Sequence, residues 1–127
     1  AEFSLREDVG LLAYSPLAAG HLSGKYLGGV VPPGSRLAVA SQFLRYNVPP
    51  QKAATARYVA LAHAFGLKPA TLALAFVHSR AFVTSSIIGA TSLDQLKGAI
   101  TGSLVTLPGE ALDAINAIQQ EIPDPCP

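Results

Sequence analysis

The sequence has 127 residues, of which 50% are hydrophobic and 13% are charged, and its formal net charge is +1. A chain of this length can form one domain that buries roughly two thirds of its unfolded surface. So small a net charge creates no field that would attract nucleic acid or an anionic membrane, and no basic patch with interleaved aromatic residues compensates for it. We therefore expect no nucleic-acid partner and no membrane partner.

The sequence carries no recognisable targeting segment. No apolar run approaches the roughly 20 residues of a membrane span. Residues 1–8 lack the order of charged, apolar and small residues that marks a signal peptide, and they resemble the end of an amphipathic helix. Because the sequence contains no methionine, we do not expect Ala1 to be a natural start.

Cys126 is the only cysteine, so no intrachain disulfide can form, which fits a cytoplasmic location. It lies in a proline-rich tail that offers neither a base nor a rigid support. We therefore interpret Cys126 as an exposed thiol without a role rather than as a nucleophile.

Residues 10–14 form a short apolar run that ends at Ser15-Pro16, which predicts a strand buried on both faces, as in a parallel sheet. The next residues, up to Gly20, are small enough for their backbone N–H groups to approach an anion. Lys25 follows as a cation that could neutralise phosphate. A proline turn with a solvated lysine would explain the same residues, and the chemistry alone does not choose between the two interpretations.

Residues 27–50 are rich in glycine and proline and predict a long irregular loop, of the kind that serves as a lid or a binding loop. A disordered insertion is the alternative. Against it stand three apolar side chains that can anchor the loop: Phe43, Leu44 and Tyr46.

Two helices are predicted next, over residues 51–65 and from Pro69 to about residue 79. Gly66 is suited to cap the first, and Pro69 suits the first turn of the second. The second helix is apolar nearly all round, so it must be covered on several sides. In the first helix, apolar residues recur at helical spacing: Ala54, Tyr58, Leu61 and Phe65.

A second strand is predicted over residues 82–88, strongest at 85–88. Thr91 is the predicted N-cap of a helix that reaches about Ile100, with Asp94 completing a capping box. A last helix, over residues 108–120, is expected to bury Ala111, Leu112, Ile115 and Ile118.

The order strand, helices, strand, helix, helix predicts an α/β fold with parallel strands and a right-handed crossover. Two strands do not make a stable parallel sheet, which needs neighbouring strands and helices on both faces. The pattern therefore predicts further strands outside these 127 residues.

Three segments resemble the aldo-keto reductase family: YSPLAAG (residues 14–20), LSGKY (22–26) and IIGATSLDQL (87–96). They are similar to the segments after the seventh and eighth strands of that family, in the branch of bacterial reductases and potassium-channel β-subunits. The resemblance implies that residues 1–127 are a partial barrel domain, the C-terminal portion of a (β/α)8 TIM barrel. It would contain about strands 7 and 8 with their helices and a C-terminal helix, while the N-terminal strands are absent.

The resemblance also implies NADP as the cofactor and assigns roles to the first loop. Tyr14 would stack on the nicotinamide, Lys25 would neutralise phosphate charge, and Arg36 would be the cation of a segment that closes over the cofactor. The alternatives are a core tyrosine and a solvated surface arginine. The pyrophosphate would be lined by Ser15, Pro16, Leu17, Ala18, Ala19 and Gly20.

After the second strand, the resemblance places the 2′-phosphate of NADP at Gly89 and Thr91, where a helix N-terminus favours an anion, with Gln95 as a further contact. The family often has an acidic residue and an asparagine where this chain has Gly98 and Ala99. Those side chains usually hold the adenine and ribose, so their loss bears on the affinity for the cofactor.

Reduction of a carbonyl by hydride transfer needs a proton donor. In this family a tyrosine supported by lysine, aspartate and histidine supplies it, and the resemblance places all four upstream of this region. We therefore assign no catalytic residue, since Tyr26, Tyr46 and Tyr58 do not match the motif.

The three histidines are too scattered for a metal site. We expect His63 and His78 on helix surfaces, and His21 either in an incidental position or near a phosphate.

The expected function is therefore that of a fragment of an NADP-dependent reductase of aldehydes or ketones, with a small carbonyl compound as its substrate. Two alternatives remain. One is an NADP-binding regulatory or interaction subunit without significant turnover, and the other is an inactive truncated remnant.

Overall fold

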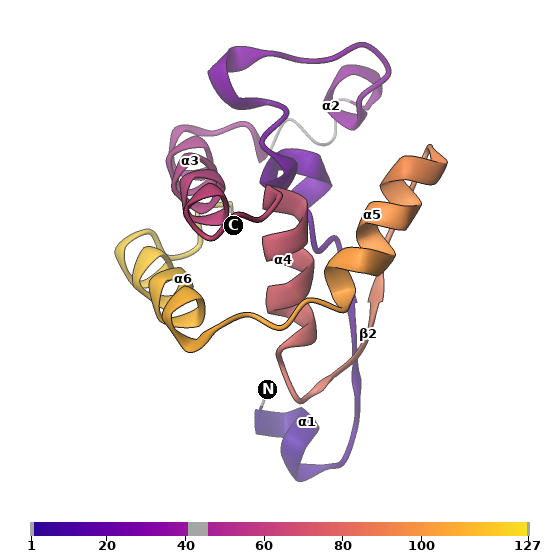
Figure 1. The fold of residues 1–127 in the computed structure, drawn as a ribbon, viewed down its shortest axis with the longest axis vertical. Coiled ribbons are helices and arrows are strands. Elements are labelled where there is room, and N and C mark those ends of the chain that lie inside the picture. The colour runs from indigo at the N-terminus through magenta and orange to yellow at the C-terminus, as the bar shows by residue number, and fades with distance from the viewer. Residues whose placement is uncertain (1, 41–45, 127) are drawn as a thin grey trace.

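The computed structural model describes residues 2–40 and 46–126 of the chain. Phe43 and Leu44, two of the expected loop anchors, lie outside these residues. Helices make up most of the described chain, and two strands lie among them (Figure 1). The elements in chain order are α1 (Glu2–Arg6), β1 (Leu11–Tyr14), the 3-10 turns η1 (Ala18–Ser23) and η2 (Leu27–Gly29), α2 (Arg36–Val39), α3 (Pro49–Ala64), α4 (Pro69–His78), β2 (Val83–Ile87), α5 (Leu93–Ser103) and α6 (Gly109–Glu121).

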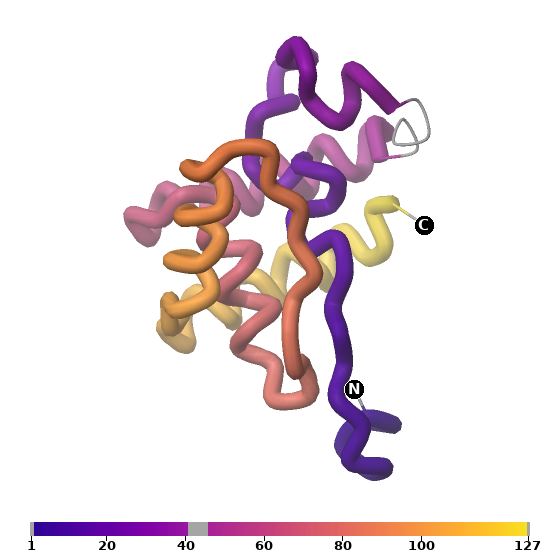
Figure 2. Tube along the Cα trace, turned by 90° about the vertical axis from the view of Figure 1, so that its right-hand side faces the viewer, coloured from indigo at the N-terminus to yellow at the C-terminus, as the bar shows by residue number. Residues whose placement is uncertain are grey.

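The two strands pair in parallel, as predicted, with α3 and α4 in the connection between them. Tyr14 is in register with Ile87 at the carboxyl end of the pair, and Leu11 with Val83 at the other end. Figure 2 shows the two strands running side by side. Because they are parallel, the loops that follow Tyr14 and Ile87 leave the sheet at the same end.

The expectation that the first strand is buried on both faces is wrong for this chain. The side chains of Leu12 and Tyr14 are 58% and 76% exposed, and that of Ile87 is 55% exposed. The reason is that, among the described residues, β1 and β2 pair only with each other. A sheet of this kind acquires its second cover only from further strands and helices.

The core lies between α3, α4 and α6. Its centre is formed by small and aliphatic side chains, with Tyr58, Leu61, Phe65, Phe76 and Leu112 packed around it. Arg57 and Glu121 join α3 to α6 by an ion pair in which Nη2 donates to Oε1 over 3.1 Å. The buried residues of the core cluster are Ala62, Leu72, Ala75, Leu107, Ala111 and Ile115.

The apolar faces predicted for the helices agree with this packing. Ala54 is buried on α3, and Tyr58, Leu61 and Phe65 are half-buried. On α6, Ala111, Ile115 and Ile118 are buried and Leu112 is half-buried. The apolar helix α4 contacts α3, α5, β2 and η1, so it is covered on several sides as expected.

The predicted ends of α3 and α4 also hold. Gly66 has a φ of 67°, and its N–H and that of Leu67 donate to the carbonyls of His63 and Ala62. This is a Schellman motif, which needs a left-handed residue that glycine adopts without strain. Pro69 begins α4, and α3 begins at Pro49, two residues before the predicted start.

The start of α5 differs from the prediction. The N-cap is Ser92, not Thr91, because the Ser92 hydroxyl accepts the Gln95 N–H at 3.3 Å. The residue that reaches back is Gln95, not Asp94, since Gln95 Oε1 accepts the Thr91 N–H at 2.9 Å. The helix begins at Leu93 and continues to Ser103, beyond the predicted Ile100.

The predicted long loop contains local structure in its described part. The short elements η2 and α2 lie within it, and Leu37 is buried, with its N–H donating to the Tyr26 hydroxyl at 3.3 Å. This contact holds residues 27–37 against the end of η1. Residues 27–40 are therefore an ordered loop rather than a disordered insertion.

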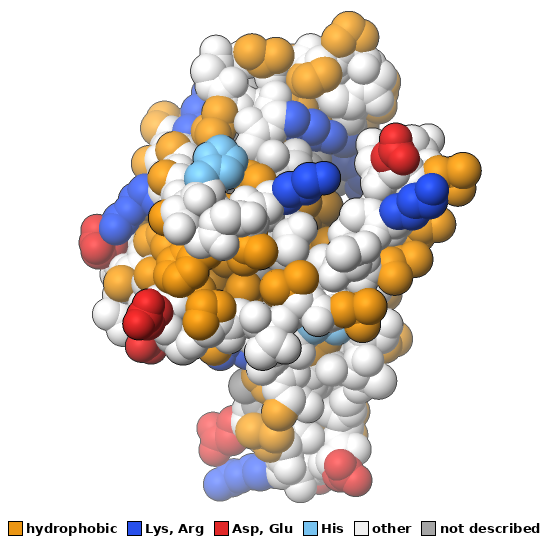
Figure 3. Space-filling view, in the orientation of Figure 1, with side chains coloured by type: hydrophobic (Ala, Val, Ile, Leu, Met, Phe, Trp, Pro, Cys, Tyr) orange, Lys and Arg blue, Asp and Glu red, His pale blue; other side chains and the backbone are white. Residues whose placement is uncertain are grey.

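The outer face of α5 carries a row of exposed apolar side chains, which we call the α5 row. It extends from Leu93, 73% exposed, to Leu104, 79% exposed. Apolar side chains follow α5 down the right-hand side of the molecule in Figure 3. The spacing of three or four residues places them on one face of the helix. The α5 row consists of Leu93, Leu96, Ile100 and Leu104.

Among the described residues, no single helix is long and apolar enough to cross a membrane, although α3 and α4, bent by 92° at their junction, reach that length and composition as a pair.

Candidate functional site

The candidate site lies at the carboxyl end of the two parallel strands. The segment after β1 runs through η1 to Lys25 and Tyr26, and the segment after β2 runs through Gly89 to the start of α5. Both segments lie at the upper end of the strands in Figure 2. In parallel α/β folds this is the end where ligands bind.

The first segment has unusual backbone geometry. Ser15, Ala18 and Ala19 have φ values of 52°, 46° and 56°, and Gly20 has a φ of 96°. For residues other than glycine this region costs roughly 1–2 kcal/mol each, and such strain concentrates at binding sites. Three of the five non-glycine residues with positive φ in the described chain thus fall within the predicted pyrophosphate loop.

Hydrogen bonds inside the loop fix this shape. The Ala18 N–H donates to the Ser15 carbonyl at 2.9 Å, and the Gly20 N–H donates to the Leu17 carbonyl at 2.8 Å. The Ser23 hydroxyl donates to the Gly20 carbonyl at 2.7 Å. The N–H groups of Ala18 and Gly20 are therefore already used within the loop.

Lys25 lies directly over Gly20. A Cβ added to Gly20 would be 2.9 Å from Lys25 Cε and 3.0 Å from Nζ. The same Nζ lies 5.1 Å from the centre of the Tyr26 ring. The missing side chain of Gly20 thus gives the lysine its place above the loop, and Lys25 remains exposed to a ligand.

Arg36 connects the two loops. It begins α2, 53 residues before Gly89 in the sequence, yet a Cβ added to Gly89 would be 3.4 Å from Arg36 Nη2. Arg36 therefore lies within about van der Waals contact of the Gly89 position. The structure therefore brings Arg36, from the long loop that follows the first segment, to the predicted phosphate loop of the second.

The start of α5 supplies the remaining predicted contacts. Thr91 donates to Gln95 Oε1 through its N–H at 2.9 Å and through its hydroxyl at 3.1 Å. The Gln95 oxygen is thus engaged, which leaves its NH₂ group as the part that can donate to an anion. The helix has 11 residues, so its N-terminal dipole favours an anion there, but Asp94 in its first turn adds a negative charge.

The other predicted site residues lie at the base of the same loop. Tyr14 is not a core residue of this chain, since its ring is largely exposed at the end of β1. Pro16 and Leu17 are half-buried, and Pro16 lines a cavity of about 410 Å³ between α4 and α6. Gly98 is exposed with open space around it, and Ala99 is half-buried.

His21 has a different position from the one considered above. It lies within η1 and is only 2% exposed, with its ring 4.8 Å from that of Tyr26 and 6.2 Å from that of Tyr46. Burial, followed by the positive charges of Lys25 and Lys52, lowers the pKa of His21 below its ordinary value of 6.5. A buried ring of this kind does not reach a phosphate on the outer side of the loop.

Sequence reasoning missed the polar cluster around His21. Ser35, Gln51 and Thr55 are buried as well, and Gln51 Nε2 donates to Thr55 Oγ1 at 2.6 Å. The spacing of Gln51 and Thr55 by one helical turn was the available signal. His63 and His78, in contrast, are exposed on their helices, as expected.

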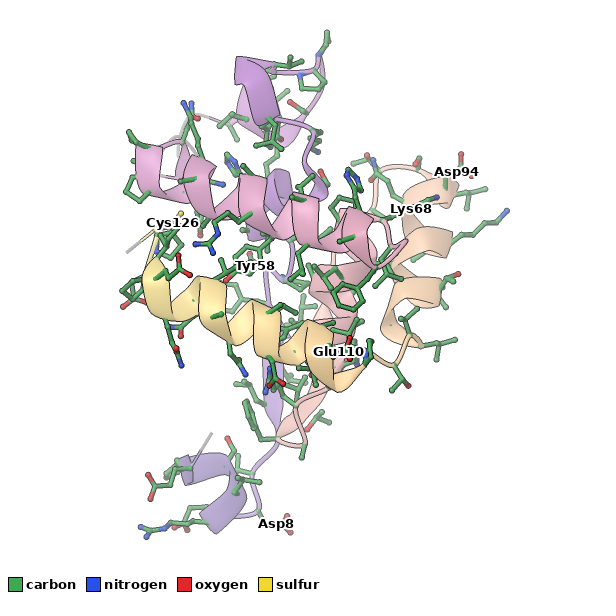
Figure 4. The ribbon with its side chains drawn as sticks, turned by 60° about the vertical axis from the view of Figure 1, so that its left-hand side comes forward. Asp8, Tyr58, Lys68, Asp94, Glu110 and Cys126 are labelled. Atoms are coloured by element: carbon green, nitrogen blue, oxygen red, sulfur yellow. The ribbon has the colours of Figure 1, made fainter. Side chains whose placement is uncertain are left out.

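Tyr26 and Tyr58, to which we assigned no catalytic role, are packed among other side chains. Burial raises the pKa of Tyr26, but the hydrogen bond from the Leu37 N–H, the nearby Ser35 side chain and the charge of Lys25 outweigh this, so the net pKa lies below 10. Tyr58 points from α3 toward α6 (Figure 4), and burial raises its pKa. Across residues 2–40 and 46–126, no three His, Cys, Asp or Glu side chains form a metal site.

Cys126 is not the exposed thiol that we expected. It is half-buried near the end of α6, where Figure 4 shows it beside α3. With Asp124 and Pro125 it lines a small cavity of about 220 Å³, whose other wall includes Ala18 and Leu22 of η1. The tail folds back under the loop, which explains the burial.

Comparison with known proteins identifies the class that this fold and site define. Residues 1–120 match the model of the aldo/keto reductase family, so the chain belongs to that family. The family implies a (β/α)8 barrel, and two parallel strands among a majority of helices are consistent with part of such a barrel.

Individual relatives agree. "Protein tas" of Escherichia coli (strain K12) is 45% identical over 127 residues, which cover 100% of this chain and 37% of that protein. An "Aldo-keto reductase" of Babesia bovis is 35% identical over 102 residues, 78% of this chain and 36% of that protein. "Uncharacterized oxidoreductase YrpG" of Bacillus subtilis (strain 168) is 31% identical over 110 residues, 87% of this chain and 32% of that protein. The chain thus spans 32–37% of the length of these relatives.

Proposed function

We propose that this chain supplies the cofactor-binding side of an NADP-dependent oxidoreductase that reduces aldehydes or ketones. In this proposal the chain forms the part of a (β/α)8 barrel that contains strands 7 and 8, with β1 and β2 in those places. The observation that carries the proposal is the approach of Arg36 to Gly89, which joins two loops at the ligand-binding end of the strands.

The residues present fit a dinucleotide phosphate. Gly20 and Gly89 each leave a space that a Cβ would fill, and a cation lies beside each space: Lys25 at Gly20 and Arg36 at Gly89. A planar guanidinium suits a terminal phosphate, whereas an ammonium acts as a point charge for a pyrophosphate. We therefore assign Arg36 and the start of α5 to the 2′-phosphate, and Lys25 with residues 15–20 to the pyrophosphate.

The exposed ring of Tyr14 would offer a flat apolar surface to the nicotinamide. Bound NADPH would supply the hydride. The role of these residues would be to hold the cofactor in one orientation at the end of the strands, since correct orientation accounts for a large part of catalysis. The proton donor for the carbonyl oxygen belongs, in this proposal, to the part of the barrel outside these 127 residues.

The test uses the full-length protein that carries this sequence. We expect it to bind NADPH, measured by the change in nicotinamide fluorescence, and to oxidise NADPH when a generic aldehyde is added. Binding without aldehyde-dependent oxidation would instead identify the regulatory or interaction subunit. Failure to bind NADPH or NADH at all would refute the proposal. The cytoplasmic location and the small carbonyl substrate stay predictions.

A further inference from the structure

The buried polar side chains that the structure describes gather in one region. They are His21, Ser35, Gln51 and Thr55, and they lie where the loop that carries Lys25 and Arg36 meets the start of α3. Burial of a polar group is costly unless it has a partner. A polar cluster at this position therefore calls for a role beyond packing.

Among these four residues, His21 is the one whose charge changes near neutral pH, and it lies in η1, next to the predicted phosphate loop. It follows Gly20, the residue over which Lys25 lies, and its ring packs against that of Tyr26, the next residue after Lys25. Its carbonyl accepts the Gly24 N–H at 2.9 Å. His21 thus supports both sides of the turn that presents Lys25.

The surroundings favour an uncharged ring. His21 Nε2 is buried and has no hydrogen-bond partner among the described residues. The charged groups that act on it are Lys25 from its own segment and Lys52 from α3, both positive. Tyr26 and Tyr46 face it as rings, while Asp124 of the C-terminal tail is exposed and lines the cavity beside Ala18 and Leu22 of η1. A proton on His21 would add a buried positive charge close to the charges of two exposed lysines.

We propose that His21 is a positioning residue of the cofactor site: its uncharged ring holds the Lys25 turn in the phosphate-binding shape, and protonation releases that turn, so that cofactor affinity falls in mildly acidic solution. This rests on the proposed function, since it concerns the same phosphate loop. No contact of His21 with the cofactor is involved.

The sign of the effect follows from the buried position. The closed loop binds a proton on His21 less tightly than an opened loop does, where the histidine has its ordinary pKa of 6.5. The closed loop therefore loses stability as the pH falls below about 6.5, and the loss stops below the lowered pKa. The affinity for NADP⁺ should fall by several-fold, and at most about tenfold for each pH unit in this range. A histidine in direct contact with phosphate would have the opposite effect, because its proton would attract the anion.

The experiment measures the affinity of the full-length protein for NADP⁺ by titration calorimetry between pH 5.5 and 8. The wild type is compared with His21→Gln, which keeps a polar side chain but does not titrate, and with the control His78→Gln on the exposed face of α4. The 2′-phosphate of NADP⁺ itself titrates near pH 6, and this contribution is common to all three proteins. We expect the wild type and His78→Gln to weaken more steeply in acid than His21→Gln, and His21→Gln to bind several-fold more tightly than the wild type at pH 5.5.

A second measurement covers the case in which His21→Gln does not fold. The imidazole of His21 is titrated by NMR in the wild-type protein with and without saturating NADP⁺. Because linkage is reciprocal, a cofactor that closes the loop must lower the pKa of His21 further. A rise on binding, or identical pH profiles for the wild type and His21→Gln, would overturn the proposal. An equal loss of affinity in His21→Gln at every pH would also overturn it, as this indicates packing alone. The absence of NADP⁺ binding at every pH would instead refute the proposed function.

Discussion

Replacing Arg36 with alanine tests whether this residue recognises the 2′-phosphate of the cofactor rather than its pyrophosphate. The guanidinium lies beside Gly89, the predicted 2′-phosphate loop, with Nη2 3.4 Å from the position of an added Cβ. NADPH carries a phosphate at that place and NADH does not. We expect Arg36→Ala to weaken NADPH binding and to leave NADH binding nearly unchanged.

The magnitude follows from the exposure of Arg36. A charge-assisted hydrogen bond between a guanidinium and a phosphate contributes about 1.5–3 kcal/mol. Solvent and salt screen an exposed pair, so the lower end applies. A loss of about 1.4 kcal/mol of binding free energy corresponds to a tenfold higher dissociation constant. The loss should shrink further in high salt.

The assay is a fluorescence titration of the full-length protein with NADPH and NADH at two salt concentrations. Arg6→Ala is the matched control: it removes the same charge from α1, which precedes β1 and lies at the end of the strands opposite the loops. The control should leave both affinities unchanged. Equal losses for NADPH and NADH in Arg36→Ala would show that Arg36 does not recognise the 2′-phosphate.

Three further predictions concern the same loops and the chain as a whole. Lys25→Ala should weaken NADPH and NADH equally, by several-fold in calorimetry, because both share a pyrophosphate; a selective loss of NADPH would contradict the assignment. Gly20→Ala should lower cofactor affinity and the melting temperature, because φ is 96° and the new Cβ would meet Lys25, whereas Gly28→Ala has strain without that contact; equal effects of the two would count against the clash. Residues 1–127 alone should show no aldehyde-dependent oxidation of NADPH, and measurable turnover by the purified chain would refute this.

Local sequence signals were sufficient for the order of the elements. Pro69 begins α4, and Gly66 ends α3 in a left-handed conformation, because each residue restricts or permits a backbone shape independently of the rest of the chain. The parallel pairing of β1 and β2 followed from the length of the helical connection between them.

The start of α5 was predicted one residue too early, because two adjacent residues offered competing caps. Thr91 and Ser92 are both suited to cap a helix, and Asp94 and Gln95 each lie three residues after one of them. The structure uses Ser92 with Gln95. The capping-box pattern has Glu or Gln three residues after Ser or Thr, so Ser92 with Gln95 matches it better than Thr91 with Asp94, and the prediction overlooked this.

Contacts between segments that are far apart in the chain could not be predicted from the sequence. The burial of the His21 ring and the approach of Arg36 to Gly89 depend on how segments far apart in the chain pack together. The exposure of Tyr14 reflects the pairing of β1 with β2 alone among the described residues. The identity of the candidate site residues could be predicted, but their mutual geometry could not.

The exposed α5 row has a consequence for how the chain would fare in a cell. The α5 row exposes four apolar side chains to water in this structure: Leu93, Leu96, Ile100 and Leu104. Exposed apolar surfaces of this type bind hydrophobic dyes and chaperones and are recognised by proteases. Where the α5 row stays uncovered, we expect chaperones and proteases to lower the amount of the protein in the cell, whether or not its site is intact.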